Sequence, residues 1–163
     1  MKISNLLIIA ILLLTACKCN NNQDKPVADD SSIIEIPDTL LVYDVNTDNK
    51  TWKRFTEVPD SAFTAIRIVN GLNQKYPEVQ LRFLKQSNDT LYVSVPDNEF
   101  LGERMGNAGA VSWFSDAVLN LTGVPGVTYV NMQMEKRTHA LPGVFTKENV
   151  KGFTERRDSI PVS

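Results

Sequence analysis

Two cysteines, Cys17 and Cys19, stand where an apolar run changes to a polar one in the stretch LLLTACKCNNNQ. Cysteines at this short spacing suit three kinds of chemistry: a disulfide, a metal site, or a covalent modification of the chain. A structural zinc site needs more ligands than two cysteines supply, and the sequence holds no second cysteine pair and one histidine, His139. We therefore predict that the protein binds no metal and no cofactor.

A signal for export precedes the cysteines. Lys2 is followed by an apolar run, Leu6–Leu14, of the length expected of a secretory signal and too short for a membrane-spanning helix. The run ends in Leu14-Thr15-Ala16-Cys17, which resembles the bacterial lipobox, in which the cysteine receives a diacylglyceryl group. We predict that residues 1–16 are a signal peptide and that acylated Cys17, a diacylglyceryl cysteine with palmitate, anchors a membrane lipoprotein. An ordinary cleaved signal peptide and an N-terminal membrane anchor are the alternatives.

Lipidation of Cys17 decides the role of the second cysteine. Cys19 then remains as the thiol, so we expect no internal disulfide; Cys19 is either a plain tether residue or a link between two chains in an oxidising compartment. Residues 17–36 are mostly polar, and we predict a flexible tether. Lys18 stands where an aspartate often retains lipoproteins at an inner membrane, so the resemblance favours the outer membrane. We expect a lipid-anchored protein of the cell envelope, on the periplasmic or outer-membrane face.

Other groups that do chemistry are few. His139, in RTHALPG, is either a general base, a pH-sensitive contact or a hydrogen-bonded turn residue. No Gly-x-Ser-x-Gly elbow accompanies it, so a serine triad has no support. We predict no catalytic residue and no enzyme; the alternative is a cell-wall or surface glycan-binding protein or hydrolase centred on the His139 loop. The carboxylates that would pair in such a hydrolase are Asp97, Glu99, Glu103 and Asp116, whose spacing defines no site.

Charge excludes one class of partner. The chain has 17 Lys and Arg against 19 Asp and Glu, and loss of Lys2 with the signal peptide leaves the mature chain more acidic still. Nucleic-acid binding needs a basic face, so we expect no nucleic-acid partner. The Gly-x-x-Gly stretch 106–109 lacks a basic side chain and reads as a tight turn into a helix. Lys136-Arg137 with Arg156-Arg157 form either a patch near lipid headgroups or a solvated surface.

The elements that position these residues follow from hydrophobic periodicity. Residues 39–45 and 50–58 read as a hairpin, and a capping signal at Pro59-Asp60-Ser61 opens a helix that continues to Tyr76. Alternating apolar residues predict a second hairpin over 78–86 and 90–95. Its expected inward side chains are Val79, Leu81, Phe83, Leu91, Val93 and Val95.

The remaining elements lie beyond Pro96. Residues 97–107 hold at most one helical turn, and a helix follows up to Gly123, then a strand over 126–134 and a short helix at 146–150. Residues 135–145 read as a loop, and Trp52 and Trp113 are expected in the core unless they mark an interface. The apolar faces expected are Phe63, Ile66, Val69 and Leu72 on the first helix, and Ala108, Val111, Phe114, Val118 and Leu121 on the second.

The order β-β-α-β-β-α-β predicts an α+β fold, a two-layer sandwich with both helices on one face of a mostly antiparallel sheet. We place the domain at residues 37–150 and a C-terminal tail at 151–163. One domain of this size has enough length for a single core.

Several stretches are similar to a known family. LLVYDV, KRFTEVPDSAFTAIRIVNGLN, TLYVSVPDNEF and AVSWFSDAVLNLTGVPGVTYVNMQME resemble the GerMN domain of sporulation and spore germination proteins, over about residues 40–135. Leu121-Thr122 and Pro125-Gly126-Val127 match its last element best. GerMN domains are similar to the ring-building motif of secretion and spore-channel assemblies. The resemblance implies a non-catalytic module that binds a protein partner or assembles with itself.

Overall fold

The computed structural model describes residues 36–150 and 154–155. The chain divides into a unit of residues 1–33 and a unit of residues 34–163, and every described residue belongs to the second. The predicted signal peptide, Cys17, Cys19 and nearly all of the predicted tether therefore lie outside the described residues, as do Arg156 and Arg157. No helix in the described part is both long and apolar enough to cross a bilayer.

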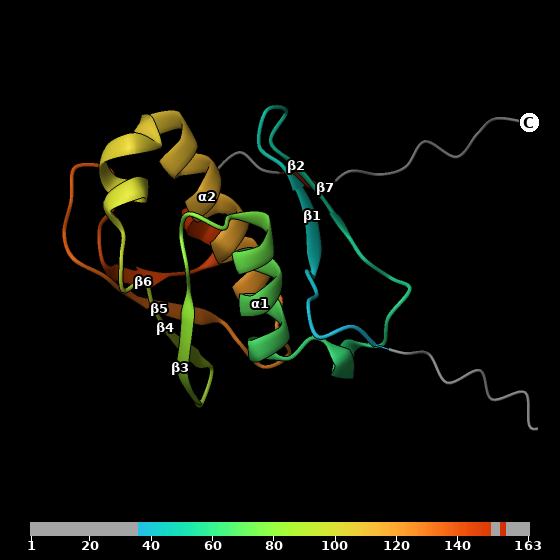
Figure 1. Ribbon diagram of the computed structural model, residues 1–163. Helices are drawn as coiled ribbons and strands as arrows, with labels where there is room; N and C mark the ends of the chain where they lie inside the picture. The colour runs from blue at the N-terminus through green and yellow to red at the C-terminus, as the bar shows by residue number, and fades with distance from the viewer. Residues whose placement is uncertain (1–35, 151–153, 156–163) are drawn as a thin grey trace, which may run out of the picture. The chain divides into compact units, whose positions relative to one another are not determined.

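Pairs of successive strands alternate with helices along the described chain (Figure 1). The elements are β1 (Tyr43–Asn46), β2 (Thr51–Arg54), the 3₁₀ turn η1 (Asp60–Ala62), α1 (Ala65–Lys75), β3 (Arg82–Ser87), β4 (Thr90–Ser94), the π-helical turn η2 (Phe100–Arg104), α2 (Gly106–Leu121), β5 (Tyr129–Gln133), β6 (Gly143–Phe145), the 3₁₀ turn η3 (Lys147–Asn149) and β7 (Thr154–Glu155).

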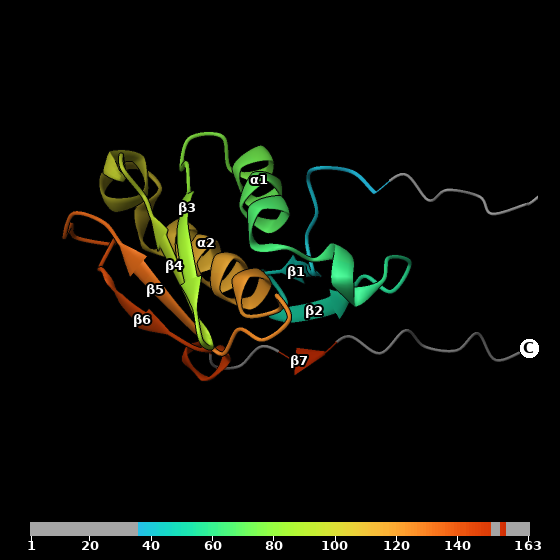
Figure 2. The ribbon, with the colours of Figure 1, turned by 90° about the horizontal axis from the view of Figure 1, so that it is seen from below.

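The strands form two sheets, with orders β3-β4-β5-β6 and β1-β2-β7. The α+β class is confirmed, but a single sheet of mostly antiparallel strands is wrong. β5 runs parallel to β4, because the connection through η2 and α2 is long enough to return the chain to the same end of the sheet. β7 is likewise parallel to β2. Figure 2 shows the two sheets apart, with α2 between them.

The second hairpin is confirmed, but β3 begins at Arg82, so residues 78–81 of the predicted strand precede it. Leu91 and Val93 are fully buried, and Asn88 takes a φ of 53° in the turn between β3 and β4. The register shifts between Phe83 and Lys85, and this bulge leaves Leu84 46% exposed on the edge strand. A bulged edge with a lysine is a poor template for pairing with another chain.

The first helix starts later than predicted. Asp60–Ala62 form a separate 3₁₀ turn, and the cap of α1 is Thr64, whose hydroxyl accepts a hydrogen bond from the Arg67 amide at 3.5 Å. The later start also shifts the buried face: Ala65, Ile68, Val69 and Leu72 are buried, whereas Ile66 is 57% exposed.

The second helix is buried on nearly every side over its last two turns. Residues 115–122 are all buried, because α2 contacts β1 through Asn120 and β6 through the Phe114–Phe145 ring pair, 5.5 Å between centroids. The predicted apolar face is wrong in its first half, where Ala108 and Val111 are exposed. A helix covered from two sides carries apolar residues all round, so periodicity does not identify one face.

Two further differences concern the chain around the sheets. β1 begins at Tyr43, and residues 37–42 instead run beside α1, with the Leu40 amide bonded to the Arg67 carbonyl at 3.1 Å. The predicted loop 135–145 contains the strand β6. The short helix predicted at 146–150 is present as η3.

Candidate functional site

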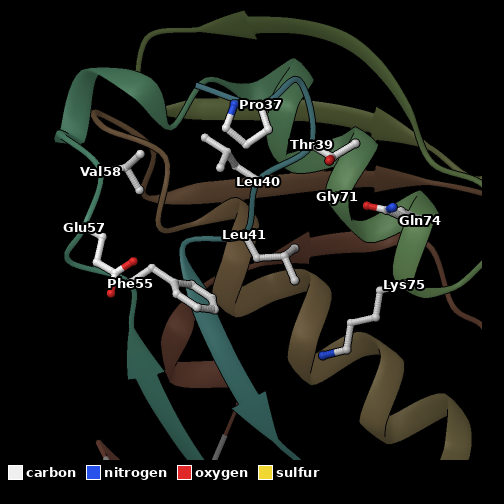
Figure 3. Close-up of a pocket in the computed structure, with 10 residues that line it drawn as sticks. All are labelled: Pro37, Thr39, Leu40, Leu41, Phe55, Glu57, Val58, Gly71, Gln74 and Lys75. Carbon is white, nitrogen blue, oxygen red and sulfur yellow. The ribbon is translucent and has the colours of Figure 1, made fainter. Parts of the chain in front are cut away.

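An open groove of about 610 Å³ lies between the chain before β1, the chain after β2 and the last turns of α1 (Figure 3). Its lining residues are Pro37, Thr39, Leu40, Leu41, Phe55, Glu57, Val58, Gly71, Gln74 and Lys75.

A glycine sets the spacing of one groove wall. A Cβ at Gly71 would lie 2.2 Å from the Leu40 carbonyl oxygen, so the segment before β1 packs directly on the backbone of α1. The Asn70 side chain also donates to the Asp38 carbonyl at 3.3 Å. The Phe55 amide donates to the Val42 carbonyl at 3.0 Å and extends the β1–β2 pairing to the third wall. The walls are thus held by close backbone packing and by hydrogen bonds to backbone carbonyls.

The groove has an apolar floor and a polar rim. Phe55 is 45% exposed, and Leu40, Leu41 and Val58 are half-buried against the core. Thr39, Glu57 and Gln74 are exposed at the edge of the groove. An apolar centre surrounded by polar groups is the usual anatomy of a protein-binding surface.

A buried carboxylate lies behind the groove. Asp116, on α2, is fully buried and forms an ion pair with Lys75, whose side chain is 35% exposed and lines the groove. Figure 3 shows Lys75 extending from α1 toward α2. The Tyr76 hydroxyl donates to Asp116 Oδ2 at 2.7 Å, and Asn120 Nδ2 donates to Asp116 Oδ1 at 2.7 Å. A buried charge needs such partners, and here three side chains supply them.

Asn120 connects this carboxylate to the first sheet. Its Oδ1 accepts from the Tyr43 amide at 2.9 Å, and its Nδ2 donates to the Tyr43 carbonyl at 3.3 Å. The side chain thereby occupies the donor and the acceptor on the edge of β1 that does not face β2. The network of Lys75, Tyr76, Asp116 and Asn120 joins α1, α2 and β1.

The network changes the acidity of one of its members. Burial raises the pKa of the Tyr76 hydroxyl well above its usual value, and the Asp116 charge and the hydrogen bond to it raise it further. Tyr76 therefore stays protonated and remains a donor to Asp116 throughout the neutral range.

His139 lines a second, smaller cavity of about 360 Å³ beside α2, β6 and η3. The Ser115 hydroxyl in this pocket donates to the Val111 carbonyl at 2.8 Å and so belongs to the helix. The residues that line the pocket are Asn107, Ala110, Val111, Phe114, Ser115, Val118, His139, Phe145, Asn149 and Val150. Most of them are apolar.

The structure does not bring the four predicted carboxylates to His139. None of them is among the described residues that line its pocket. Asp116 belongs to the network behind the groove, Asp97 accepts from the Glu99 amide at 3.1 Å, and Glu99 pairs with Arg104 at 2.7 Å. Glu103 is exposed on the π-helical turn.

The burial and the bonding partners of the remaining candidate residues are as follows. Trp113 is fully buried and Trp52 is half-buried, edge-on to Tyr43 at 4.8 Å between centroids. Arg137 bonds to Glu135 at 2.8 Å and to Asn98 at 3.0 Å, and Lys136 is exposed. Gly106 opens α2 with a φ of 70°, the tight turn predicted there.

Sequence reasoning missed the groove and its network. Asp116 and Asn120 lie four residues apart and so share a helix face, which was a usable signal, but the partners Lys75 and Tyr43 come from distant segments. Among the described residues, no group of three or more His, Cys, Asp or Glu side chains is placed to hold a metal ion. Comparison of the chain with protein-family models, curated proteins and solved structures found no match.

Proposed function

We propose that this protein is a membrane-anchored bacterial lipoprotein whose GerMN-like domain is a non-catalytic protein-interaction module of the cell envelope. The groove beside α1 is the site that takes the partner, through apolar side chains laid between Leu41, Phe55 and Val58. The observation that carries this proposal is an apolar groove with fixed walls and a half-exposed phenylalanine at its mouth. The anchor part of the proposal depends on the sequence Leu14-Thr15-Ala16-Cys17.

The groove suits a partner because its shape exists before binding. Gly71 lets the Leu40 backbone approach α1 closely, and the Asp116–Lys75 ion pair fixes α1 against α2. A preformed surface loses less conformational entropy on binding than one that must be ordered, and so keeps more of its contact energy as affinity.

The pocket at His139 gives the glycan alternative less support. A glycan hydrolase needs carboxylates that converge on the sugar, and none of the described residues that line this pocket is acidic. The groove therefore remains the preferred site.

Photo-crosslinking in intact cells tests the site. A benzophenone amino acid in place of Phe55 should capture a discrete protein partner. The matched control replaces Ile66, which is 57% exposed on α1 but does not line the groove, and should capture little. Leu41→Asp should abolish capture from position 55, because it places a charge in the apolar floor. Equal capture from positions 55 and 66, or capture unaffected by Leu41→Asp, would refute the site.

Metabolic labelling tests the anchor separately. A fatty-acid analogue should label the protein, and Cys17→Ala should remove the label while Cys19→Ala retains it. Persistent label in Cys17→Ala contradicts the lipoprotein assignment.

A further inference from the structure

The sheet β3-β4-β5-β6 buries one face and exposes the other. The buried face carries Leu91, Val93, Val130 and Met132, which belong to the core, and α2 lies between this sheet and the first one (Figure 2). Because side chains alternate along a strand, the residues between these four lie on the opposite face. We call this opposite face the outer face; the residues on it that matter below are Arg82, Lys85, Tyr92, Tyr129, Asn131 and Gln133.

The outer face carries two cations without a carboxylate partner. Arg82 and Lys85 are exposed on β3, and no ion pair between described residues involves either of them. Arg54, Arg104 and Arg137, in contrast, each pair with a carboxylate. The outer positions of the four strands include no acidic residue, although the chain as a whole is acidic. The outer face is therefore a local positive surface, which complements an anionic ligand.

A tyrosine and two amides lie on the same face, two strands away from the cations. Tyr129, Asn131 and Gln133 occupy outer positions of β5, and Tyr129 is 41% exposed. No hydrogen bond between described residues involves these three side chains. Gln133 is level with Arg82 through the pairing of both with β4, and Tyr129 stands four residues before Gln133. Tyr129 and Arg82 thus lie roughly 16 Å apart, at opposite corners of the face.

This combination of groups fits a sugar polymer better than a protein or a nucleic acid. The apolar side of a sugar ring stacks on an exposed aromatic ring, and sugar hydroxyls exchange hydrogen bonds with amides. A protein interface has an apolar centre, whereas the middle of the outer face holds Lys85, Tyr92 and Asn131, with Lys85 Nζ 4.7 Å from the centre of the Tyr92 ring. Two cations are also few for a phosphate backbone, which is bound through many contacts.

We propose that the outer face binds an acidic polysaccharide, with a sugar ring stacked on Tyr129 and carboxylates of the polymer paired with Arg82 and Lys85. Asn131 and Gln133 supply hydrogen bonds between these two ends. A span of about 16 Å takes several sugar units, so a monosaccharide does not reach both ends. This binding is a second function, separate from that of the groove beside α1, and neither depends on the other.

Calorimetric titration of the full-length protein in detergent tests the class of ligand. Polygalacturonate oligosaccharides should bind, and added salt should weaken the binding because the ion pairs are exposed. Dextran, a neutral polysaccharide, should bind about tenfold more weakly, since it forms neither ion pair. Failure of polygalacturonate to bind overturns the proposal, as does equally tight binding of dextran or of single-stranded DNA.

Substitutions of Tyr129 test the stacking. Tyr129→Ala should weaken polygalacturonate binding about tenfold, because it removes the aromatic ring, whereas Tyr129→Phe should keep the affinity within about twofold. The control is Ile66→Ala, which truncates an exposed apolar side chain on α1 and should leave the affinity unchanged. Wild-type affinity in Tyr129→Ala refutes a sugar site on this face.

Substitutions of the two cations test the ion pairs. Arg82→Gln and Lys85→Gln should each weaken binding about threefold and should lessen the effect of salt. Lys50→Gln removes an exposed charge in the turn between β1 and β2 and should change neither quantity. Wild-type affinity in both Arg82→Gln and Lys85→Gln overturns the proposal.

Sedimentation of the protein without polysaccharide tests a different occupant of the face. The wild-type protein and Tyr129→Ala should sediment alike. A dimer that Tyr129→Ala dissociates would show that a second copy of the chain covers the outer face, and would overturn the polysaccharide site.

Discussion

The groove beside α1 and the pocket at His139 differ in what stands behind their walls. Behind the groove is a charged network in which every polar side chain already has a partner, with Asp116 bonded to Lys75, Tyr76 and Asn120. The His139 pocket is walled mainly by apolar side chains, most of which belong to α2. His139, the one histidine of the chain, thus lines a pocket with no acidic side chain among the described residues. The buried carboxylate of Asp116 instead lies behind the groove, whose described lining includes no histidine.

This contrast shows that the chemical type of a residue does not by itself predict its role in the fold. Asp116 was a candidate acid in the sequence, and in the fold it positions two helices and a strand. Because Asp116 positions these elements, substitutions behind the groove should lower the stability of the fold far more than substitutions at His139.

The largest effect is expected from Asp116→Ala. The change leaves Tyr76 and Asn120 without their shared acceptor and Lys75 without its counter-ion, so the free energy of unfolding should fall by about 3 kcal/mol. Urea unfolding at neutral pH measures it. Glu103→Ala, an exposed carboxylate, is the control and should change stability by no more than about 0.5 kcal/mol. Similar losses of stability for the two variants would contradict a structural role specific to Asp116.

Gly71→Ala should have the next largest effect. At an open helical position this change stabilises by about 0.8–1.0 kcal/mol, but here the new methyl group meets the Leu40 carbonyl oxygen. We expect a net loss of about 1–3 kcal/mol and a shifted groove wall, visible as amide chemical-shift changes at Thr39 to Leu41. Gly143→Ala, where the nearest atom would be 3.5 Å away, should be nearly neutral. A stabilised Gly71→Ala protein contradicts the close approach.

Tyr76→Phe should show its effect through pH. At neutral pH it removes the hydroxyl donor to Asp116 and should destabilise by about 1–2 kcal/mol. The pKa of Tyr76 is raised in the folded state, so its contribution is fully present below the unfolded value of about 10 and is lost as pH rises above it.

Unfolding midpoints measured from pH 8 to pH 12 check this sign. The wild-type protein should lose stability faster than Tyr76→Phe above about pH 10, and the two curves should converge. Curves that stay parallel over this range contradict a tyrosine held protonated by the fold.

The smallest effect is expected from His139→Ala. The His139 side chain is half-buried and is one of ten residues that line its pocket. The free energy of unfolding should therefore change by about 0.5 kcal/mol or less. Capture from position 55 should also be unchanged. A loss of unfolding free energy as large as that of Asp116→Ala would show that His139 has a structural role, contrary to this prediction.

Local patterns predicted the elements that have one covered face. Alternation around Leu91 and Val93 identified the β3–β4 hairpin, because β4 places every second side chain in the core. The pattern failed in α2, where two covered faces erase the period, and at β6, which holds three residues between loops. The parallel pairing of β4 with β5 depends on a crossover that local periodicity does not encode.

The candidate site could not be predicted from local sequence patterns, for a different reason. The groove forms where segments 37–41 and 55–58 meet α1, and no single stretch contains its shape. The role of Gly71 depends on the Leu40 carbonyl that packs against it, and Leu40 lies about thirty residues earlier in the chain. His139 was a candidate general base, pH-sensitive contact or turn residue by its type alone, and its neighbours in the pocket come from α2, β6 and η3, which the sequence near His139 does not indicate.

The side chain of Asn120 also bears on solubility. By occupying the Tyr43 amide and carbonyl, it leaves that part of β1 nothing to offer an incoming extended chain, so growth of an intermolecular sheet cannot begin there. An extended chain that meets β1 at Tyr43 finds both main-chain groups already bonded, which protects this end of the strand against fibril formation.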